Sequence, residues 1–590
     1  MQAFVLTGLP RIRRHAGTPG VLAIAVLIAG CVLLLQPFGF NQGAHYSLVK
    51  ALAHGTAKID DFQAFSGDES YFDGHYFSNK APGVAFLCLP FYLLLQTLGL
   101  PSGVHVLALL ASALPAFVLL LLVRRVADDW EPGFGTAAAI TLGAGTLFLP
   151  FTSLFFAHVL SAFLGFAAFA VLWRERAGPS RALLVAAAGL LAGLAVLVEY
   201  PLALVGLVLG FYVVGRAPVV RRGLAYTAGV IAGVLPLLLY NRWAFGSFTH
   251  LSYSNLVIVR GKSGHDVVQG VGRLGAHHVQ PGFHDVSGPR LRELLELLFL
   301  SRGILRLMPV LVLGIVGLVM LYRRGRRAES LVIGGVTILI LTYDSGFVDP
   351  FGGWGPGPRY LMPMMPFLLL PIALVYARAP LTTVALALGS IFVMVAATAT
   401  EPLLANNIFT FIRLGDIANT GRWFHRFGAG NFTRTVLSSA GLGHGWVAIA
   451  PFLLAVAAAL ALAARATPWP RFERRDAETA AVAVVGWLLL AIDGPLLLHH
   501  DRTSGGTFGA IAATTLAAAI VATCFRVWHG GVRAAVPSVP LFAFAAHAFA
   551  HHTAWAAGLV LGVLLAMIAL EARGLRGSSG HAQQDVPVRS

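Results

Sequence analysis

Charged residues are scarce in this sequence: Asp, Glu, Lys and Arg together make up 12% of its 590 residues, about half the ~25% typical of soluble chains. Hydrophobic residues make up 57%, and the mean hydropathy is +0.76. A soluble protein of this length needs more charge to cover its water-facing surface. The composition therefore excludes a multidomain soluble protein and predicts a polytopic membrane protein.

Cysteine is almost absent, since the sequence contains three cysteines, Cys31, Cys88 and Cys524. Each lies in or beside an apolar run, which argues against a disulfide framework and against a thiolate metal site. The net charge of +16 suggests nucleic acid as a partner, but no basic cluster carries interleaved aromatic residues. We therefore expect no nucleic-acid binding, and the arginines need another explanation.

Apolar runs recur along the chain, and sixteen of them come close to the ~20 residues that cross a bilayer as a helix. The sixteen runs lie at 20–38, 103–123, 134–153, 155–173, 182–198, 201–215, 223–241, 303–322, 329–346, 360–378, 380–398, 447–465, 477–497, 506–525, 535–550 and 555–571. We therefore expect an all-α fold with about sixteen transmembrane helices. A seventeenth run, 84–100, is short and contains Pro90.

The distribution of arginine predicts the orientation of the chain, because cytoplasmic loops carry an excess of Lys and Arg. With Arg11, Arg13 and Arg14 placed inside, 25 of the 42 basic residues fall in cytoplasmic segments. A span at 84–100 would move every later arginine cluster to the opposite side. We therefore expect 84–100 to be an interfacial or re-entrant helix and both termini to be cytoplasmic.

The loops on the outer face are long, whereas the cytoplasmic loops are too short to hold a nucleotide-binding domain. The long outer loops are 39–102, 244–302, 344–359 and 399–446. We expect residues 1–465 to form the core, 466–575 to add a four-helix membrane extension, and 576–590 to be a disordered tail.

Polar residues concentrate in the first outer loop. Its candidate site residues are Asp60, Asp61, His75, Tyr76 and Lys80. Lysine is a point-charge partner for phosphate, and a carboxylate held at a bilayer surface can accept a proton from a hydroxyl. Two adjacent acids are more often a solvated turn, so the Asp60-Asp61 pair does not define a site by itself.

The third outer loop is rich in glycine and proline and contains Trp354 and Arg359. Irregular backbone of this kind is tolerated at membrane depth only where protein covers it or where it lines a cavity. The Arg359 guanidinium can hold a lipid phosphate through two hydrogen bonds, although interfacial arginines also snorkel without such a role. We take Trp354 and Arg359 as further site candidates.

The segment GHYFSNKAPG at 74–83 runs directly into the apolar stretch 84–100. This arrangement resembles the GT-C superfamily, membrane glycosyltransferases of the protein-mannosyltransferase and aminoarabinose-transferase kind. Their first outer loop ends in a Tyr-x-x-Lys-Pro-Pro-like segment that leads into a membrane-surface helix. The stretches YSLVKAL at 46–52, FFAHVL at 155–160 and 354–366 are similar to a bacterial branch, so that the resemblance covers residues 20–460.

The resemblance implies transfer of a hexose or pentose from a polyprenyl-phosphate donor to a hydroxyl of an envelope glycan, lipid or protein. The transfer would be one inverting displacement on the outer face of a bacterial plasma membrane. Lys80 and Arg359 would bind the departing phosphate, where negative charge develops. The sequence leaves open whether a divalent cation takes part.

The sequence departs from the superfamily pattern after the first span. Relatives usually carry an acidic pair there that includes the presumed catalytic base, whereas this chain has Asn41-Gln42, and neither amide can act as a base. Either the base has moved to Asp60 or Asp61, or the chain has another activity. His158 falls where relatives often have an acid of the site, although a lone histidine on an apolar helix is more often structural.

Other functions stay open at this point. A secondary transporter or flippase would need charged groups or broken helices at the midplane, whereas the polar groups here gather on one face. A lipid-linked glycan polymerase or ligase would share the outer site and depend on a large late outer loop, which 399–446 could supply. A non-catalytic scaffold would explain Asn41-Gln42.

The variants Asp60→Asn and Asp61→Asn, assayed separately for sugar transfer, test the displaced base. A general base contributes about 10²–10⁴ in rate, so the variant that removes it should lose at least ~100-fold activity. If neither variant loses that much, the base lies elsewhere.

Overall fold

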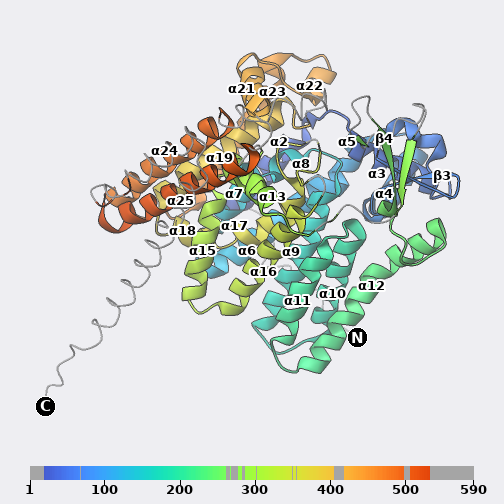
Figure 1. Cartoon of the computed structure of the whole chain (residues 1–590), viewed down its shortest axis with the longest axis horizontal. Coiled ribbons are helices and arrows are strands. Elements are labelled where there is room, and N and C mark those ends of the chain that lie inside the picture. The colour runs from blue at the N-terminus through green and yellow to red at the C-terminus, as the bar shows by residue number, and fades with distance from the viewer. Residues whose placement is uncertain are drawn as a thin grey trace.

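Helices make up most of the computed structural model (Figure 1). The structure describes residues 19–66, 68–260, 266–267, 277–281, 286, 288–299, 302–347, 350–353, 355–403, 417–496, 505–531, 534 and 538. The expected spans 535–550 and 555–571 and the expected tail 576–590 lie outside these residues.

The described elements follow each other in this order. The helices are α2 (Pro19–Val32), α3 (Phe40–Ala53), η1 (Asp60–Phe65), α4 (Gly83–Thr97), α5 (Val104–Ala108), η2 (Leu109–Ala113), α6 (Leu114–Trp130), α7 (Gly135–Gly145), α8 (Phe148–Thr152), α9 (Ala157–Arg176), α10 (Ala182–Val198), α11 (Leu202–Val214), α12 (Val219–Phe245), η3 (Ser252–Ser254), α13 (Leu291–Phe299), α14 (Ile304–Leu307), α15 (Leu311–Arg323), α16 (Arg327–Ser345), η4 (Arg359–Met364), α17 (Met365–Leu369), α18 (Ile372–Tyr376), α19 (Pro380–Thr400), α21 (Ile417–Gly428), α22 (Val436–Ser439), α23 (Gly445–Ala466), α24 (Arg474–Leu496) and α25 (Gly505–Gly530). The strands are β1 (Leu34–Leu35), β2 (Glu69–Phe72), β3 (His75–Ser78), β4 (Asn255–Arg260), β5 (Asp266–Val267), β6 (His277–Pro281) and β7 (Arg434–Thr435).

Among the described residues, six helices are long and apolar enough to cross a membrane by themselves. They are Val104–Trp130, Ala157–Arg176, Val219–Phe245, Arg327–Ser345, Pro380–Thr400 and Gly445–Ala466. Of the shorter apolar helices, α2 and α4 precede these six in the chain, and α10 and α11 lie between the second and the third. The chain is thus a multi-pass membrane protein, while the count of about sixteen spans and the orientation of the termini stay predictions.

Three runs that we expected to be continuous spans are divided into separate helices. The run 134–153 divides at Thr146 into α7 and α8. The run 303–322 divides around Pro309 into α14 and α15. The run 360–378 divides into η4, α17 and α18, in a stretch that contains Pro363, Pro366 and Pro371. Proline removes a backbone donor and clashes with the preceding helical turn, which explains the divisions of the last two runs.

The run 84–100 forms α4, whose fifteen residues extend about 22 Å at 1.5 Å per residue. That length is short of a ~30 Å hydrocarbon core. Its first residue packs against the end of α10, because a Cβ on Gly83 would lie 2.7 Å from the carbonyl oxygen of Leu197. The interfacial position of α4 stays a prediction.

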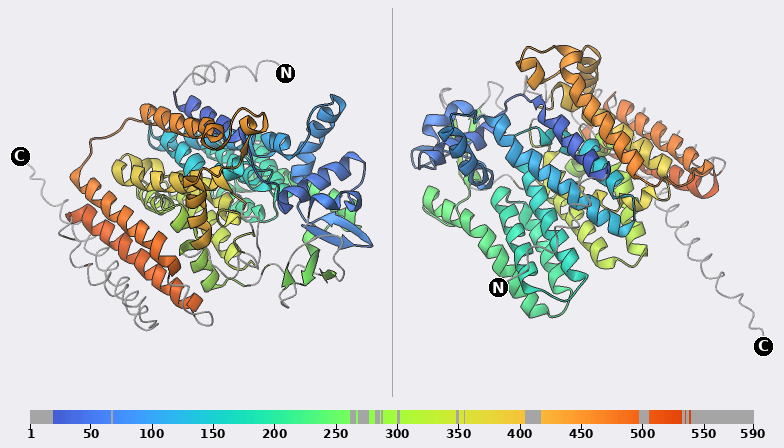
Figure 2. Two further views of the ribbon diagram at one scale, coloured as in Figure 1. Left: turned by 90° about the horizontal axis from the view of Figure 1, so that it is seen from above. Right: turned by 180° about the vertical axis from the view of Figure 1, so that it is seen from behind.

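The expectation of an all-α fold is wrong in one region, where a small antiparallel sheet joins two long loops. Strands β2 and β3 from the loop 39–102 pair with each other, and β2 also pairs with β4 from the loop 244–302 through Ser70 and Leu256. These strands lie together at one edge of the molecule (Figures 1 and 2). Asp73 and Gly74 form the β2–β3 turn with φ of 48° and 79°, as an Asp-Gly hairpin turn requires.

A second strand pair links the loop 399–446 to the segment between α2 and the loop 39–102. Residues Leu34 and Leu35 of β1, which follow α2, pair with Thr435 and Arg434 of β7. The loop 399–446 is therefore anchored at the start of the first loop.

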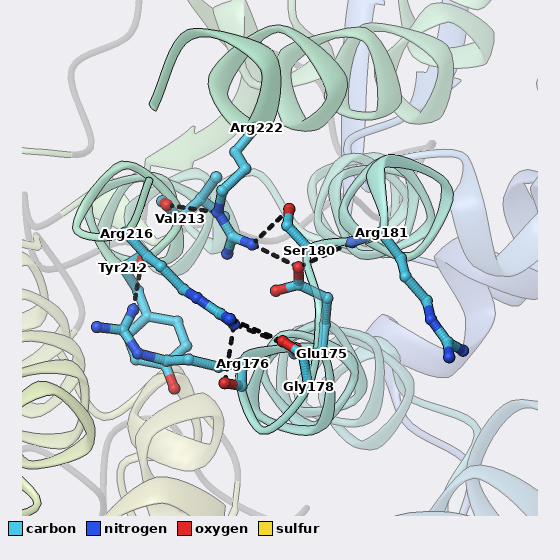
Figure 3. A network of polar contacts seen from close by, with 9 residues as sticks. All are labelled: Glu175, Arg176, Gly178, Ser180, Arg181, Tyr212, Val213, Arg216 and Arg222. Atoms are coloured by element: carbon cyan, nitrogen blue, oxygen red, sulfur yellow. Dashed lines mark hydrogen bonds and ion pairs between the residues drawn. The ribbon is translucent and has the colours of Figure 1, made fainter. Parts of the chain in front are cut away.

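Arginines gather at one end of α9, α10, α11 and α12, which we call the arginine end (Figure 3). Arg222, which is fully buried, forms an ion pair with Glu175 and donates hydrogen bonds to Val213 O (3.1 Å) and Ser180 Oγ (3.2 Å). Arg216 donates to Arg176 O (2.8 Å). A buried charge is tolerated when it is paired and hydrogen-bonded, so Glu175 is the partner that allows Arg222 to be buried at the arginine end.

Part of the C-terminal extension is described. Helix α24 packs on α25 and on α19, and Asp476 accepts hydrogen bonds from the backbone amides of Leu381 (2.7 Å) and Thr382 (3.0 Å). This carboxylate caps the start of α19, where backbone N–H groups lack helical partners.

The packing of α10 on α12 depends on glycine. A Cβ on Gly193 would lie 2.9 Å from Gly233 Cα and would also meet Val230 O. Gly193→Ala should therefore lower the melting temperature in detergent, because overpacking costs about 1–3 kcal/mol. Gly206→Ala on α11 is the matched control, since its Cβ meets nothing closer than 3.9 Å. Equal melting of both variants would contradict this packing.

Candidate functional site

A cavity opens at the opposite end of α9 and α10 from the arginine end, with an empty volume of about 740 Å³ counted to its open mouth. We call this end the site end. The lining residues are Asn41, His45, Lys80, Ala81, Ala157, His158, Val198, Glu199, Tyr200, Pro201, Leu202, Tyr253, Tyr343, Phe347, Tyr360 and Pro363. They come from α3, the segment before α4, the start of α9, the α10–α11 corner, η3, the α16 region and η4.

Lys80 is held in the cavity wall by two loops that are distant in sequence. Its ammonium lies 2.9 Å from Asp68 Oδ2 and 5.9 Å from the ring centre of Tyr253. The hydroxyl of Ser252 lies 3.2 Å from Asn79 O and 3.4 Å from Lys80 O and donates to these carbonyls. The buried lysine is therefore fixed both at its charge and at its backbone.

His158 and Glu199 contact each other in the cavity wall through His158 Nδ1 and Glu199 Oε1. Glu199 Oε2 accepts a hydrogen bond of 2.5 Å from the hydroxyl of Ser161, one turn further along α9. The pair meets because α10 ends at Val198 and its turn into α11 brings Glu199 beside the first turn of α9. His158 is 2% exposed.

Arg359 lies beside the cavity and is not among the residues that line it. Its guanidinium lies 5.4 Å from the ring centres of both Phe156 and Tyr360, and the His158 ring packs 5.7 Å from that of Tyr360. Gly352, at φ 71°, leaves room for the arginine, because a Cβ there would lie 2.8 Å from Arg359 Nε. A cation on two aromatic faces is held in place at little cost.

The third loop is shaped by a buried arginine. Arg302, 1% exposed, donates hydrogen bonds to the carbonyls of Gly353 (3.0 Å) and Gly355 (2.6 Å). These bonds satisfy backbone acceptors in the Gly- and Pro-rich stretch that precedes Arg359. Trp354, which we took as a site candidate, lies outside the described residues.

The amides Asn41 and Gln42 have different surroundings. Asn41 lines the cavity. Gln42 donates to Pro37 O (2.8 Å) and accepts from Phe155 N (3.2 Å), so it ties α3 to the segment before α9. A carboxylate at 42 could not donate to Pro37, and this explains why an amide occupies the position.

His45 adds a second histidine to the cavity wall. It is 1% exposed, and its Nδ1 has no hydrogen-bond partner among the described residues. Burial lowers the pKa of His45 well below the usual range, and the nearby charges of Lys80, His158 and Arg359 lower it further. The neutral form of His45 is therefore favoured.

Four candidates of the first loop lie apart from the cavity lining. Asp60 accepts hydrogen bonds from His75 Nδ1 (3.1 Å) and from the backbone amide of Tyr76 (3.0 Å), and the Asp60 and His75 side chains are 37% and 41% exposed. Asp61 is exposed next to it. The structure thus brings together Lys80, Arg359 and His158, while a role for Asp60 or Asp61 as the base stays a prediction.

Sequence reasoning did not single out Glu199. The signal was the Glu199-Tyr200-Pro201 corner between two apolar runs, since a proline corner fixes where an acid at the helix end points. It also missed Asp68 as the partner of Lys80 and Ser252 as the clamp of its backbone. The contact with Ser252 joins segments more than 170 residues apart, and no local pattern predicts it, whereas Asp68 lies in the same loop as Lys80.

No group of three or more His, Cys, Asp or Glu residues that could hold a metal ion occurs among the described residues. The cavity wall offers His45, His158 and Glu199, but Glu199 is already engaged with His158 and Ser161.

Comparisons with known proteins give a likeness in structure alone. No family model matches the chain, and no curated protein sequence matches it. Among solved structures, ArnT from Cupriavidus metallidurans bound to undecaprenyl phosphate is similar over 86% of this chain and 88% of its own, at 15% identity and a TM-score of 0.43. ArnT in the apo state is similar over 92% and 75%, at 12% identity and a TM-score of 0.38. At such identities, function has to be inferred from the side chains of the site.

Behind the cavity, Glu69 in β2 is 1% exposed, and neither of its carboxylate oxygens has a hydrogen-bond partner among the described residues. Burial raises the pKa of Glu69 from 4.5 to about 8, and the charges of Asp68 and Asp60 add to the rise. The unfolded chain loses this proton near pH 4.5, whereas the folded protein keeps it until about pH 8.

Stability should therefore fall as the pH rises from 4.5 to about 8, because the folded state binds the proton more tightly than the unfolded state. Glu69→Gln should remove this part of the pH dependence. The difference in melting temperature, variant minus wild type, should therefore be larger at pH 9 than at pH 4. Thermal melts in detergent at both pH values measure it. Wild-type and variant curves that stay parallel would show that Glu69 carries no such proton.

Proposed function

We propose that this chain is a membrane glycosyltransferase that moves a hexose or pentose from a polyprenyl-phosphate donor to a hydroxyl of an envelope glycan, lipid or protein. The observation that carries the proposal is that Lys80 and the His158–Glu199 pair line one cavity. The transfer needs a cation for the leaving phosphate and a proton acceptor for the hydroxyl. This cavity offers both.

The donor phosphate binds between Lys80 and Arg359 in this proposal. Lys80 lines the cavity, and Arg359 lies beside it, with its guanidinium 5.4 Å from the ring centre of Tyr360, which also lines the cavity. Charge on the bridging oxygen grows as the sugar–phosphate bond breaks, so two fixed cations stabilise the transition state more than the ground state. The displacement proceeds in one step with inversion.

The prenyl chain has an apolar surface available beside the phosphate. Helix α4 begins at Gly83, three residues after Lys80, and exposes Leu87, Leu93 and Leu94. Lipid chains lie against such surfaces in a membrane protein. With the arginine end cytoplasmic, as the positive-inside rule expects, the cavity lies on the extracytoplasmic face of a bacterial plasma membrane.

The rival functions differ from this one in a single measurable event. A transporter or flippase would bind the same lipid-linked donor without breaking the sugar–phosphate bond. A polymerase or ligase would use the loop 399–446, where Arg426 already pairs with Glu401 at 2.8 Å. Cleavage of the donor bond by the chain in membranes, with label moving to a second molecule, therefore separates transfer from transport.

Lys80→Ala and Arg359→Ala should each abolish transfer of label from undecaprenyl-phosphate glucose, mannose or arabinose, whichever the wild type uses. Each should also weaken binding of undecaprenyl phosphate to the purified protein, because a charged hydrogen bond to phosphate is lost. Size-exclusion profiles and melting temperatures check that the variants are folded.

The matched controls are Lys58→Ala, an exposed lysine of the same loop, and Arg434→Ala, an exposed arginine of the loop 399–446. Both should keep wild-type transfer and binding. Full activity of folded Lys80→Ala and Arg359→Ala protein would contradict the assignment of these residues to the phosphate site. Absence of any donor cleavage by the wild type would contradict the proposed transferase function itself.

A further inference from the structure

The His158–Glu199 pair has the geometry of a base held by a carboxylate. Glu199 Oε1 pairs with His158 Nδ1, so the proton of the neutral imidazole belongs on Nδ1 and the lone pair on Nε2. Ser161 occupies the other oxygen of Glu199 and fixes the carboxylate. The ring itself is enclosed by Phe151, Phe156 and Tyr360.

The second nitrogen of this imidazole, Nε2, is the atom that could accept a hydrogen bond from a ligand. His158 Nε2 is buried and has no hydrogen-bond partner among the described residues. A buried polar atom without a partner costs free energy, so such an atom in a cavity wall indicates a group that arrives with the substrate. A hydroxyl is the simplest donor that would fit.

Two other carboxylates of the first loop are already engaged. Asp60 is exposed and accepts from His75 and Tyr76, and Asp68 neutralises Lys80. His45 shares the cavity, but no described carboxylate is paired with it to stabilise an imidazolium. The charged or titratable groups around His158 are Glu199, Lys80, Arg359 and His45, and Glu199 alone among them is anionic.

We propose that His158 is the proton acceptor of the transfer and that Glu199 is its positioning residue, an inference that rests on the proposed function. As the acceptor oxygen bonds to the anomeric carbon, its proton passes to His158 Nε2. The bond from the anomeric carbon to the phosphate oxygen breaks, and its electron pair leaves with the polyprenyl phosphate beside Lys80. The imidazolium is stabilised by Glu199 and later returns its proton to solvent.

This assignment explains why Asn41-Gln42 can stand where relatives have an acidic pair. The proton acceptor is supplied by α9 and the α10–α11 corner, so α3 is free to use Gln42 as a tie to Phe155. It also assigns phosphate binding and proton transfer to different parts of the chain. The loop 39–102 binds phosphate through Lys80, and the helix bundle takes the proton.

The test compares His158→Ala, Glu199→Gln and, as the control, His54→Ala in full-length protein, with the labelled donor that the wild type uses. His158→Ala should lose about 100-fold or more in kcat, with the Kd for undecaprenyl phosphate unchanged. Added imidazole should restore part of the activity of His158→Ala. Glu199→Gln should lower kcat in the same direction without rescue by imidazole. His54→Ala, which changes an exposed histidine outside the cavity, should keep wild-type activity.

A base that acts in the chemical step is distinguished from a structural histidine by the imidazole rescue and by unchanged phosphate binding. If His158→Ala does not fold, His158→Asn takes its place, because its side-chain amide can still donate a hydrogen bond to Glu199 in the position of His158 Nδ1. Activity of either folded variant within 10-fold of the wild type would overturn the inference but not the proposed transferase function. A ~100-fold loss that occurs only in Asp60→Asn or Asp61→Asn would have the same consequence. If the wild type cleaves no donor, the proposed function fails and this assignment falls with it.

Discussion

The ion pair between Lys80 and Asp68 organises the site end of this protein. A lysine buried in an apolar wall needs a partner for its charge. Asp68, the residue just before β2, is that partner. That pairing holds the β2–β3 hairpin against the bundle, and the loop 244–302 then adds β4 to the hairpin and Ser252 to the Lys80 backbone. One buried cation thus brings two loops and the start of α4 to a single cavity.

The same physical rule acts at both ends of the helices with different outcomes. At the arginine end, the Arg222–Glu175 ion pair lies in the protein interior, among hydrogen bonds to Val213 and Ser180 (Figure 3). At the site end, the His158–Glu199 pair lies in the wall of a cavity, and His158 Nε2 has no hydrogen-bond partner among the described residues. The first pair stabilises the fold, whereas the second lies beside space for a substrate.

Several features of the site followed from local sequence alone. Lys80 precedes an apolar helix, and Arg359 follows a Gly- and Pro-rich stretch, so both were placed near the membrane surface by composition. The sheet could have been anticipated from the alternating residues around Asp73-Gly74, since that dipeptide is a strong hairpin signal. The pairing of Glu199 with His158 could not, because forty residues and a helical hairpin separate them and either residue alone has an ordinary structural explanation.

The sequence by itself determined that this is a multi-pass membrane protein, because a chain with 12% charged residues has no way to cover its surface with water-facing groups. It also determined which residues are candidates, since charge in an apolar chain is kept only where something pairs with it. Only the tertiary structure decided which candidates meet. Asp60 and Asp61 point to an exposed turn, while Lys80 and His158 share a wall, because long-range contacts through Asp68, Ser252 and Glu199 set that geometry.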